Sequence, residues 1–316
     1  MRGDASNMRA AVITALNTAP VVQEFGEPPV SPGARKISVI AAGASPTDLM
    51  RAAGVYGSFV PPCIVGGEGV GRLEDGSRVY FGHSHSPYGA WADRTIVPDA
   101  EVWPIPADVS DGQAIALGIS GTGALIPLQE AKIQAGERVL ILGASGALGQ
   151  IALQLARHMG AGTVVAAARN LPALERLRAR GIADEIAQLG TGDDLGALKA
   201  VAGPGYDVVL DVIFGPPAEA ALRATAAGAR MMSIGVQAGF TMSVSLRDLV
   251  SRSHSGVGTG MRPVAERRAA FDRLIDLGRR GKVQVDVTNF TLAEAAQAWD
   301  AQRLSPHGKI IVSTGY

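Results

Sequence analysis

The sequence predicts an α/β protein with two domains, one rich in short strands and one in which strands and helices alternate. The first third contains short β-like segments that Gly and Pro residues separate. From about residue 107 the pattern changes to alternating strands and helices, which is typical of a parallel sheet covered by helices. A chain of 316 residues also exceeds the usual domain size of about 100–200 residues, so two units that share one cleft are expected.

Local patterns predict the individual elements. Strands in the first third are expected at residues 10–14, 36–42, 69–73, 78–82 and 91–97. An apolar strand at 138–142 then precedes a helix, because Leu148, Ile151, Leu155 and Met159 recur with helical spacing before Gly160 ends the stripe.

The alternation continues along the second half of the chain. Strands are expected at 163–167, 207–210 and 229–234, and a helix begins at Asn170 and Pro172 and ends at Gly181. Such fully apolar strands suit a doubly wound sheet that is buried on both faces. A basic helical stretch at 263–280 leads to β-like segments at 282–288 and 309–313, and we expect this tail to rejoin the first domain.

Composition favours a small-molecule partner. Lys and Arg number 29, as do Asp and Glu, so no global charge would recruit nucleic acid or an anionic membrane. The one cysteine, Cys63, cannot form an internal disulfide or a four-thiolate zinc site, and its apolar neighbours predict an inert buried thiol. The apolar run 10–16 is too short to span a membrane and lacks a signal-peptide layout, so a cytoplasmic location is expected. The polar residues 1–7 are left out of the expected fold.

A glycine-rich segment joins an expected strand to an expected helix at residues 143–149. Glycine permits the tight turn and lets backbone N–H groups approach a pyrophosphate, whose charge the positive end of the helix stabilises. An ordinary glycine-rich turn is the alternative, but the flanking strands and helix favour a dinucleotide loop. The expected cofactor-binding residues here are Gly143, Ser145, Gly146, Ala147, Leu148 and Gly149.

The end of the next strand indicates which dinucleotide is bound. NAD-preferring folds place an acidic residue about 20 residues beyond the loop. Here Arg169 and Asn170 occupy that region, and an arginine forms charge-assisted bonds to a 2′-phosphate. The sequence therefore predicts NADPH in preference to NADH, the alternatives being that Arg169 is a solvated surface residue and that Asn170 is a helix N-cap.

Four ordered motifs resemble those of the medium-chain dehydrogenase/reductase superfamily, in its zinc-independent quinone oxidoreductase branch. Residues 42–48, followed by Arg51, Gly54 and Tyr56, are similar to the signature A-G-x-N-P-x-D…R-x-G-x-Y. Segments 65–69, 143–149 and 308–310 resemble the G-H-E-G, cofactor-loop and closing G-K-[VI] motifs. The resemblance covers nearly the whole chain.

The resemblance implies a fold and the absence of a metal. It implies a GroES-like β-rich catalytic domain at 8–117 and 281–316, and a Rossmann NADP(H)-binding domain at 118–280. Ser45, Gly67 and Ile119 stand where zinc alcohol dehydrogenases of this superfamily place their catalytic ligands. No catalytic zinc is therefore expected, which disfavours unassisted alcohol oxidation.

The activity that the resemblance implies is hydride transfer from NADPH to a quinone or an α,β-unsaturated carbonyl compound, which need mainly orientation. The nicotinamide is expected beside Ser45, Thr47, Tyr56 and the strand ends near 211–214 and 234–236, which include Ile234 and Gly235. Tyr56 is a candidate proton or hydrogen-bond donor, with a structural ring as the alternative. A hydrogen-bonding or structural role is expected for Thr47.

Other residues leave several interpretations open. His83 and His85 lie in a loop that reaches toward substrate in the family, and a solvated loop, pocket lining and a metal site are the alternatives. Asp48 is assigned a structural role, and Lys309 either approaches cofactor phosphate or ends a strand. Ser45, Gly123 and Leu189 depart from the branch's usual Asn, Thr and Tyr, so the cofactor is expected to be held differently in detail.

The segment 253–261 aligns with the edge strand through which relatives pair, so a homodimer is expected. Two alternative functions remain open. One is a pathway-specific enoyl reductase, whose sequence signals overlap with those of a quinone reductase. The other is a catalytically silent NADPH-binding protein, since no catalytic residue is certain.

Overall fold

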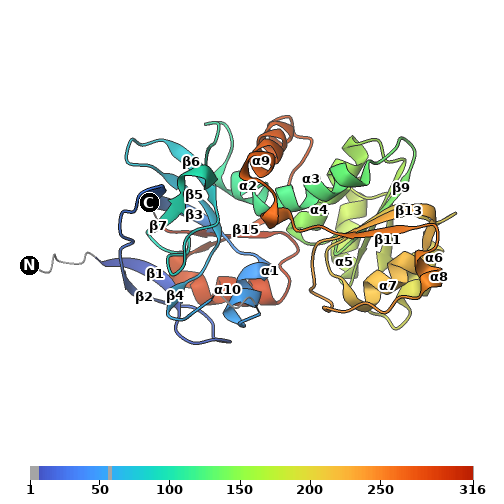
Figure 1. Ribbon diagram of the computed structural model, residues 1–316, viewed down its shortest axis with the longest axis horizontal. Coiled ribbons are helices and arrows are strands. Elements are labelled where there is room, and N and C mark those ends of the chain that lie inside the picture. Colours follow the sequence, from blue (N-terminus) through green and yellow to red (C-terminus); the bar gives the residue numbers. More distant parts are fainter. Residues whose placement is uncertain (1–6, 56–58, 316) are drawn as a thin grey trace, which may run out of the picture. The chain divides into compact units, whose positions relative to one another are not determined.

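The first unit, formed by residues up to 119 and from 286 onward, is built mainly of short strands (Figure 1). The computed structural model describes residues 7–55 and 59–315. Strands of this unit are β1 (Asn7–Ile13), β2 (Val21–Gly26), β3 (Ala34–Gly43), β4 (Cys63–Ile64), β5 (Glu68–Arg72), β6 (Arg78–Gly82), β7 (Arg94–Pro98), β8 (Val102–Pro104), β15 (Val287–Thr291) and β16 (Lys309–Ser313). Its helices are α1 (Pro46–Ala52), α2 (Asp111–Ala116) and α10 (Ala295–Arg303), with short 3-10 turns at Asp99–Glu101 and Leu292–Glu294.

Two sheets organise these strands. One runs in the order β15-β16-β3-β5-β6-β8, with β7 also paired to β3, and the other in the order β2-β1-β4. The C-terminal strand β16 pairs antiparallel with β3, so the end of the chain belongs to this unit. Between the sheets lies an apolar core in which the rings of Trp91 and Trp299 meet edge to face, 6.2 Å apart between centroids.

A buried ion pair ties the C-terminal strand to β5. Lys309 Nζ lies 2.5 Å from Glu68 Oε1, and both side chains are 2% exposed. The other carboxylate oxygen of Glu68 accepts hydrogen bonds from the Tyr80 hydroxyl at 2.7 Å and from the Ile119 N–H at 2.9 Å. Because two charges removed from water are tolerated only when fully paired and hydrogen-bonded, these four groups must be present together. Lys309 was expected either to approach the cofactor phosphate or to end a strand, and in the structure it lies at an end of the strand β16.

The second unit, residues 120–285, holds a six-stranded sheet in the order β11-β10-β9-β12-β13-β14. Every neighbouring pair in it is parallel. Its strands are β9 (Arg138–Leu142), β10 (Thr163–Ala168), β11 (Glu185–Gln188), β12 (Tyr206–Asp211), β13 (Thr225–Ser233) and β14 (Ser253–Gly256). Its helices are α3 (Ile119–Ala131), α4 (Ala147–His158), α5 (Leu171–Ala179), α6 (Asp194–Ala200), α7 (Gly215–Arg223), α8 (Leu246–Leu249) and α9 (Val264–Arg279), with a 3-10 turn at Thr259–Met261.

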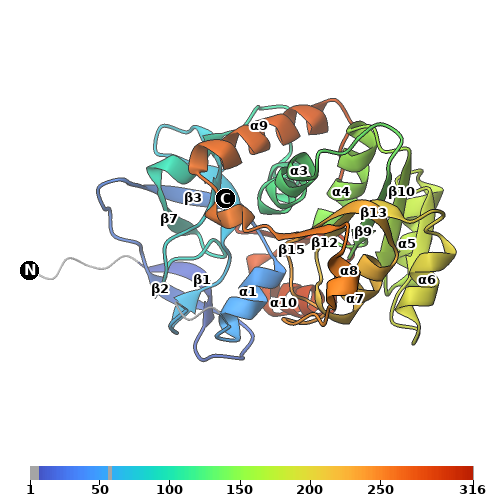
Figure 2. The same cartoon turned by 45° about the vertical axis from the view of Figure 1, so that its right-hand side comes forward.

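Helices cover this sheet, and the α/β fold class with a doubly wound parallel sheet is confirmed. Strands β10, β9, β12 and β13 stand side by side in Figure 2. Helices α6 and α7 contact each other and bury Leu198 and Leu222 against apolar side chains of the central strands. Helices α4 and α5 pack against β9, β10 and β11. Within the described residues, no helix is both long and apolar enough to cross a membrane.

The expected strand at 282–288 is wrong, since the strand β15 begins only at Val287. Gly281 adopts a φ of +67° at the end of α9, and the N–H of Lys282 bonds to the Leu277 carbonyl. The N–H of Gln284 then bonds to Gln154 Oε1 of α4. These amides therefore serve a helix end and a side chain, although Val283 and Val285 alternate with polar residues as in a strand.

The buried ion pair yields a stability prediction. Replacement of Lys309 by Met (Lys309→Met) leaves the Glu68 carboxylate buried without its cation, so the free energy of unfolding should fall by about 3–5 kcal/mol. The exposed ion pair between Arg280 and Asp276 provides a control, because Arg280→Met should cost less than about 1 kcal/mol. Urea unfolding followed by circular dichroism measures both variants, and equal losses would contradict the assignment.

Candidate functional site

The strand order of the second unit reverses between β9 and β12. Leu142 at the end of β9 lies opposite Asp211 at the end of β12, and the chains leaving these two residues go to α4 and α7. In open α/β sheets, ligands bind outside the carboxyl ends of the strands at such a reversal. The segment 143–149 follows β9, so the expected cofactor loop lies at this position.

Three glycines of the loop differ in what surrounds them. Gly143 has a φ of +74°, and a Cβ there would lie 2.4 Å from the Val212 side chain. A Cβ on Gly149 would lie 2.5 Å from both the Ala144 Cα and the Gly143 carbonyl oxygen. At Gly146, by contrast, the nearest heavy atom to an added Cβ is 3.7 Å away. Internal packing therefore requires glycine at 143 and 149, whereas the surface of Gly146 is open to a ligand.

Backbone N–H groups of the first turn of α4 point out of the helix start. The main-chain ladder begins with the Gln150 N–H, which bonds to the Gly146 carbonyl at 2.9 Å, so the amides of Ala147, Leu148 and Gly149 precede it. The first turn contains no acidic residue, which leaves the positive end of the helix dipole available to an anion. Gln150 is buried and donates to the Ser145 carbonyl at 3.2 Å, which holds the loop.

Strand ends beside the loop are held by a buried carboxylate. Asp211 is fully buried, and burial raises the pKa of its carboxyl above the ordinary value. It accepts hydrogen bonds from the N–H groups of Ile213 and Phe214 at 3.0 and 2.8 Å, and from the Ser233 hydroxyl at 2.7 Å. Ser233 Oγ lies 3.0 Å from His254 Nε2 on β14. Phe214 has a φ of +56°, which a bulky residue adopts only where surrounding contacts fix it.

The expected residues Ile234 and Gly235 meet the same strand end. The Ile234 N–H bonds to the Asp211 carbonyl at 2.9 Å, and a Cβ on Gly235 would lie 2.0 Å from the Val212 carbonyl oxygen. The structure thus brings the glycine loop, residues 212–213 and residues 234–235 together. Ser233 and His254 were not expected, and only the register of the parallel strands connects them to Asp211.

Arg169 and Asn170 follow β10, next to the loop. The N–H groups of Gly143 and Ala144 bond to the Ala167 carbonyl at 2.9 and 3.1 Å. Arg169 is exposed, and its guanidinium forms no ion pair with the described residues. Asn170 Oδ1 accepts a hydrogen bond from the Ala173 N–H at 2.8 Å, so its side chain caps α5, as the alternative interpretation had it.

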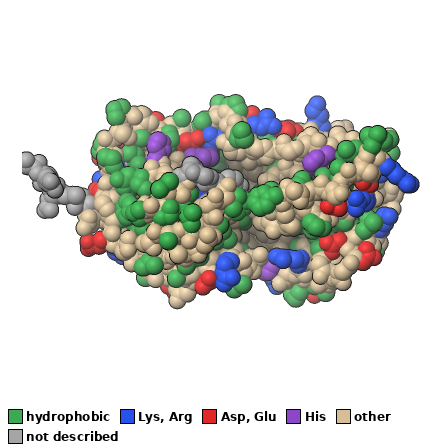
Figure 3. Space-filling view, turned by 60° about the horizontal axis from the view of Figure 1, so that its bottom comes forward, with side chains coloured by type: hydrophobic (Ala, Val, Ile, Leu, Met, Phe, Trp, Pro, Cys, Tyr) green, Lys and Arg blue, Asp and Glu red, His purple; other side chains and the backbone are tan. Residues whose placement is uncertain are grey.

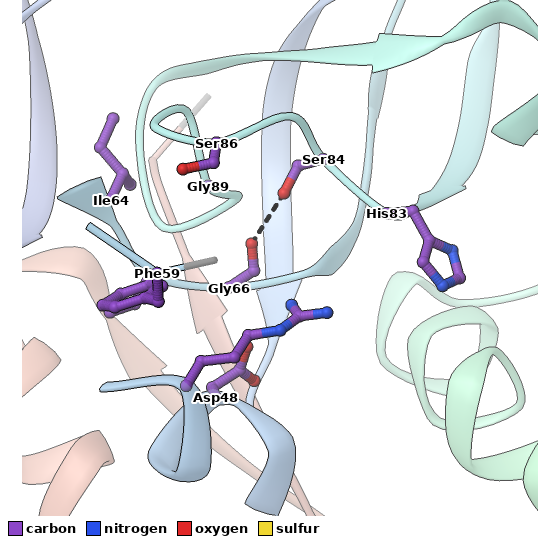
Figure 4. A pocket seen from close by; sticks show the side chains of 10 residues that line it. Asp48, Phe59, Ile64, Gly66, His83, Ser84, Ser86 and Gly89 are labelled. Atoms are coloured by element: carbon purple, nitrogen blue, oxygen red, sulfur yellow. Dashed lines mark hydrogen bonds between the residues drawn. The ribbon is translucent and has the colours of Figure 1, made fainter. Parts of the chain in front are cut away.

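A cavity of about 260 Å³ lies within the first unit, beside α1. Residues that line it include Asp48, Arg51, Phe59, Ile64, His83 and Ser84. Figure 4 shows Phe59 and Ile64 at one end and His83 at the other, with the Ser84 hydroxyl donating to the Gly66 carbonyl at 3.0 Å between them. His85 is exposed, and within residues 7–55 and 59–315 no three His, Cys, Asp or Glu side chains are grouped as metal ligands.

The catalytic candidates on α1 are placed in different ways. Asp48 is buried, and its carboxylate accepts hydrogen bonds from the Ser45 N–H at 2.9 Å and the Ser45 hydroxyl at 2.7 Å. The structural role of Asp48 is therefore confirmed, and the Ser45 hydroxyl is used at the helix start. Thr47 is partly exposed, and Tyr56 lies outside the described residues. Cys63 is buried as expected, and burial raises the pKa of its thiol to about 11.

Known proteins resemble both the sequence and the fold. A family model described as zinc-binding dehydrogenase matches residues 147–277. The quinone oxidoreductase from Thermus thermophilus, solved alone and with NADPH, is 30% identical with a TM-score of 0.81, over 97% of this chain and 100% of that one. The chain belongs to the medium-chain dehydrogenase/reductase superfamily, in its quinone oxidoreductase branch.

The chain matches different shares of the length of two curated relatives. Quinone oxidoreductase-like protein 2 from Rattus norvegicus is 28% identical over 81% of the chain and 76% of that protein. Phenolphthiocerol synthesis polyketide synthase type I Pks15/1 from Mycobacterium marinum is 36% identical over 66% of the chain. The match spans only 10% of the length of that polyketide synthase.

The packing around the loop glycines yields a second prediction. Gly149→Ala should lower the free energy of unfolding by about 2–3 kcal/mol, because its Cβ meets main-chain atoms that must move apart. Gly146→Ala adds a methyl group into open space at a helix N-cap and should cost about 1 kcal/mol or less. Urea midpoints of the two variants compare the effects, and a Gly146→Ala loss as large as that of Gly149→Ala would contradict the geometry.

Proposed function

We propose that this protein is an NADPH-dependent reductase that delivers hydride to a quinone or an α,β-unsaturated carbonyl compound without zinc. The observation that carries the proposal is the open surface of Gly146, at the positive end of α4, between two glycines that packing closes. Such a surface accepts a pyrophosphate on backbone amides. The complex of the Thermus thermophilus relative with NADPH supports the same ligand.

Residues of the second unit would hold the cofactor. Loop residues Gly143, Ser145, Gly146, Ala147, Leu148 and Gly149 present main-chain groups to the diphosphate, and Ile234 and Gly235 line the adjoining strand end. Arg169, exposed and without an ion-pair partner among the described residues, is available to a 2′-phosphate. Asn170 offers its remaining polar atoms from the same turn. When bound, the reduced cofactor supplies a hydride, and the acceptor gains that hydride and one proton.

The first unit supports a reaction without a metal. Gly67 and Ile119 lack donor atoms on their side chains, and the Ser45 hydroxyl is bonded to Asp48. The residues at the three expected ligand positions therefore do not fit a zinc ion. Ser45, Thr47 and Tyr56 remain the proposed acceptor-side residues of the reaction.

A small-molecule acceptor, a cytoplasmic location and a homodimer complete the proposal. Figure 3 shows Lys and Arg interspersed with Asp and Glu on the face in view, which offers no broad field of one sign there. The buried thiol of Cys63 suits a reducing compartment. Strand β14 ends the six-stranded sheet, and its outer edge is the proposed surface for pairing of two copies.

The test of the function is a panel of acceptors. Quinones, enones and enoyl thioesters are each mixed with protein and NADPH, and loss of NADPH absorbance is followed. Turnover of quinones or simple enones is expected. Turnover of enoyl thioesters alone would favour the enoyl reductase that the polyketide synthase relative suggests. NADPH binding without any turnover would contradict the reductase and favour a silent binding protein.

Coenzyme choice gives a separate prediction. Arg169→Asp should weaken NADPH binding about tenfold to a hundredfold, because charge-assisted bonds to the phosphate are lost and a repulsive carboxylate replaces them. NADH lacks that phosphate, so its affinity should change little. Fluorescence titrations with both nucleotides measure the ratio, and Arg178→Asp on the exposed side of α5 is the matched control. An unchanged ratio in Arg169→Asp would overturn this assignment.

A further inference from the structure

Several polar side chains of the cavity beside α1 already interact with other groups of the protein. The Ser84 hydroxyl donates to the Gly66 carbonyl, and His83 Nδ1 lies 3.5 Å from Glu101 Oε2. The Asp48 carboxylate accepts hydrogen bonds from the Ser45 N–H and from the Ser45 hydroxyl. Each of these side chains is therefore already used by the protein itself.

Arg51 differs from the other cavity-lining groups. It lies in the last turn of α1 and is partly buried, and its guanidinium forms no hydrogen bond or ion pair within the described residues. Its positive charge acts on the buried Asp48 carboxylate: burial raises the pKa of that carboxyl, and the charge of Arg51 opposes the rise. Its Nη1 lies 3.1 Å from the position of a Cβ on Gly67, so the guanidinium borders the residue that replaces a zinc ligand of relatives. A guanidinium has five N–H donors and keeps its charge at any physiological pH.

The rest of the cavity suits the body of an acceptor. Phe59, Ile64 and Val65 supply an apolar wall, while the Ser86 hydroxyl is on an exposed loop. In such a pocket, the apolar wall contacts the body of a compact ligand, and the charged donor binds one polar atom of the ligand and so orients it. Lys309 pairs with Glu68 and is not among the lining residues. Arg51 is the one arginine or lysine among the described lining residues; its charge acts on Asp48, and its N–H donors form no hydrogen bond with the described part of the chain.

We propose that Arg51 is a catalytic residue that binds the carbonyl oxygen of a quinone or α,β-unsaturated acceptor in this cavity. The proposal rests on the proposed function, because that function supplies the hydride. Hydride addition to the conjugated carbon forms a C–H bond, and the π electrons move onto the carbonyl oxygen. Arg51 stabilises this oxyanion by hydrogen bonds. The C–H bond that breaks is the one that held the hydride on the reduced cofactor, which is left as NADP⁺. Water then supplies one proton and leaves hydroxide: in an enone the proton goes to the α carbon and gives the saturated ketone, and in a quinone it goes to the oxygen, after which a ring proton shifts to the second oxygen and gives the quinol.

This role requires a charge and a donor but no proton transfer from Arg51. A positive group fixed in the cavity performs the polarisation for which zinc relatives use a metal ion. Removing one donor to a developing oxyanion typically lowers kcat by about 10²–10³-fold. A purely structural arginine would change stability instead and would leave turnover of the folded protein nearly intact.

The experiment compares Arg51→Met, Arg51→Lys and the control Arg72→Met, an exposed arginine of β5. With NADPH and an acceptor that the wild-type protein reduces, Arg51→Met should lower kcat/KM about a hundredfold while the Kd for NADPH stays unchanged. Arg51→Lys should recover part of the loss because it keeps the charge. Arg72→Met should retain wild-type turnover.

Chemical rescue separates catalysis from misfolding. Activity of Arg51→Ala should rise when methylguanidinium is added at concentrations that leave its circular dichroism unchanged, and Arg72→Ala should show no such rise. Turnover of Arg51→Met within threefold of wild type, or loss only in Tyr56→Phe, would overturn the role of Arg51 and leave the reductase intact. A wild-type protein that turns over no acceptor would instead defeat the proposed function itself.

Discussion

The turn from β9 into α4 is the constraint on which the second unit depends. Gly149 brings the first turn of α4 so close to the main chain at Gly143 and Ala144 that no Cβ fits between them. The same closeness sets the helix axis toward the carboxyl end of β9, where the strand order reverses. Of the three loop glycines, Gly146 is the one at which a Cβ would meet no atom closer than 3.7 Å, so one backbone path gives tight packing at Gly143 and Gly149 and room for a ligand at Gly146.

The residues that follow β12 depend on a second constraint, which is electrostatic. Asp211 is held without solvent by two main-chain N–H groups and one hydroxyl, so its carboxylate fixes the chain that leaves β12. That chain supplies Val212, whose side chain excludes a Cβ at Gly143. The wall of the crevice and the glycine loop therefore support each other through packing, with His254 linked to the wall through Ser233.

Local patterns predicted much of this fold, and their limits are physical. The expected strands 78–82, 138–142 and 309–313 coincide with β6, β9 and β16, because short apolar runs bounded by turn residues specify their own ends. The strand β2 was not expected, since it is largely exposed and lacks an apolar alternation. The glycine loop could be found from spacing alone. The contacts of Asp211 with Ser233, 22 residues away, and of Glu68 with Lys309, 241 residues away, depend on strand pairing that no local pattern contains.

The distribution of charge shows how the two units divide the proposed chemistry. In the first unit, the buried carboxylate of Glu68 is satisfied by Lys309 and Tyr80. Asp48, which lines the cavity, is satisfied by the start of α1, and the charge of Arg51 acts on it from the same cavity. In the second unit, main-chain amides supply the proposed phosphate contacts. The proposed contact of Arg51 with the acceptor and the proposed phosphate contacts of the glycine loop then lie on different residues, so side chains of the cavity can change, and acceptor preference with them, while the backbone that would hold the diphosphate keeps its path.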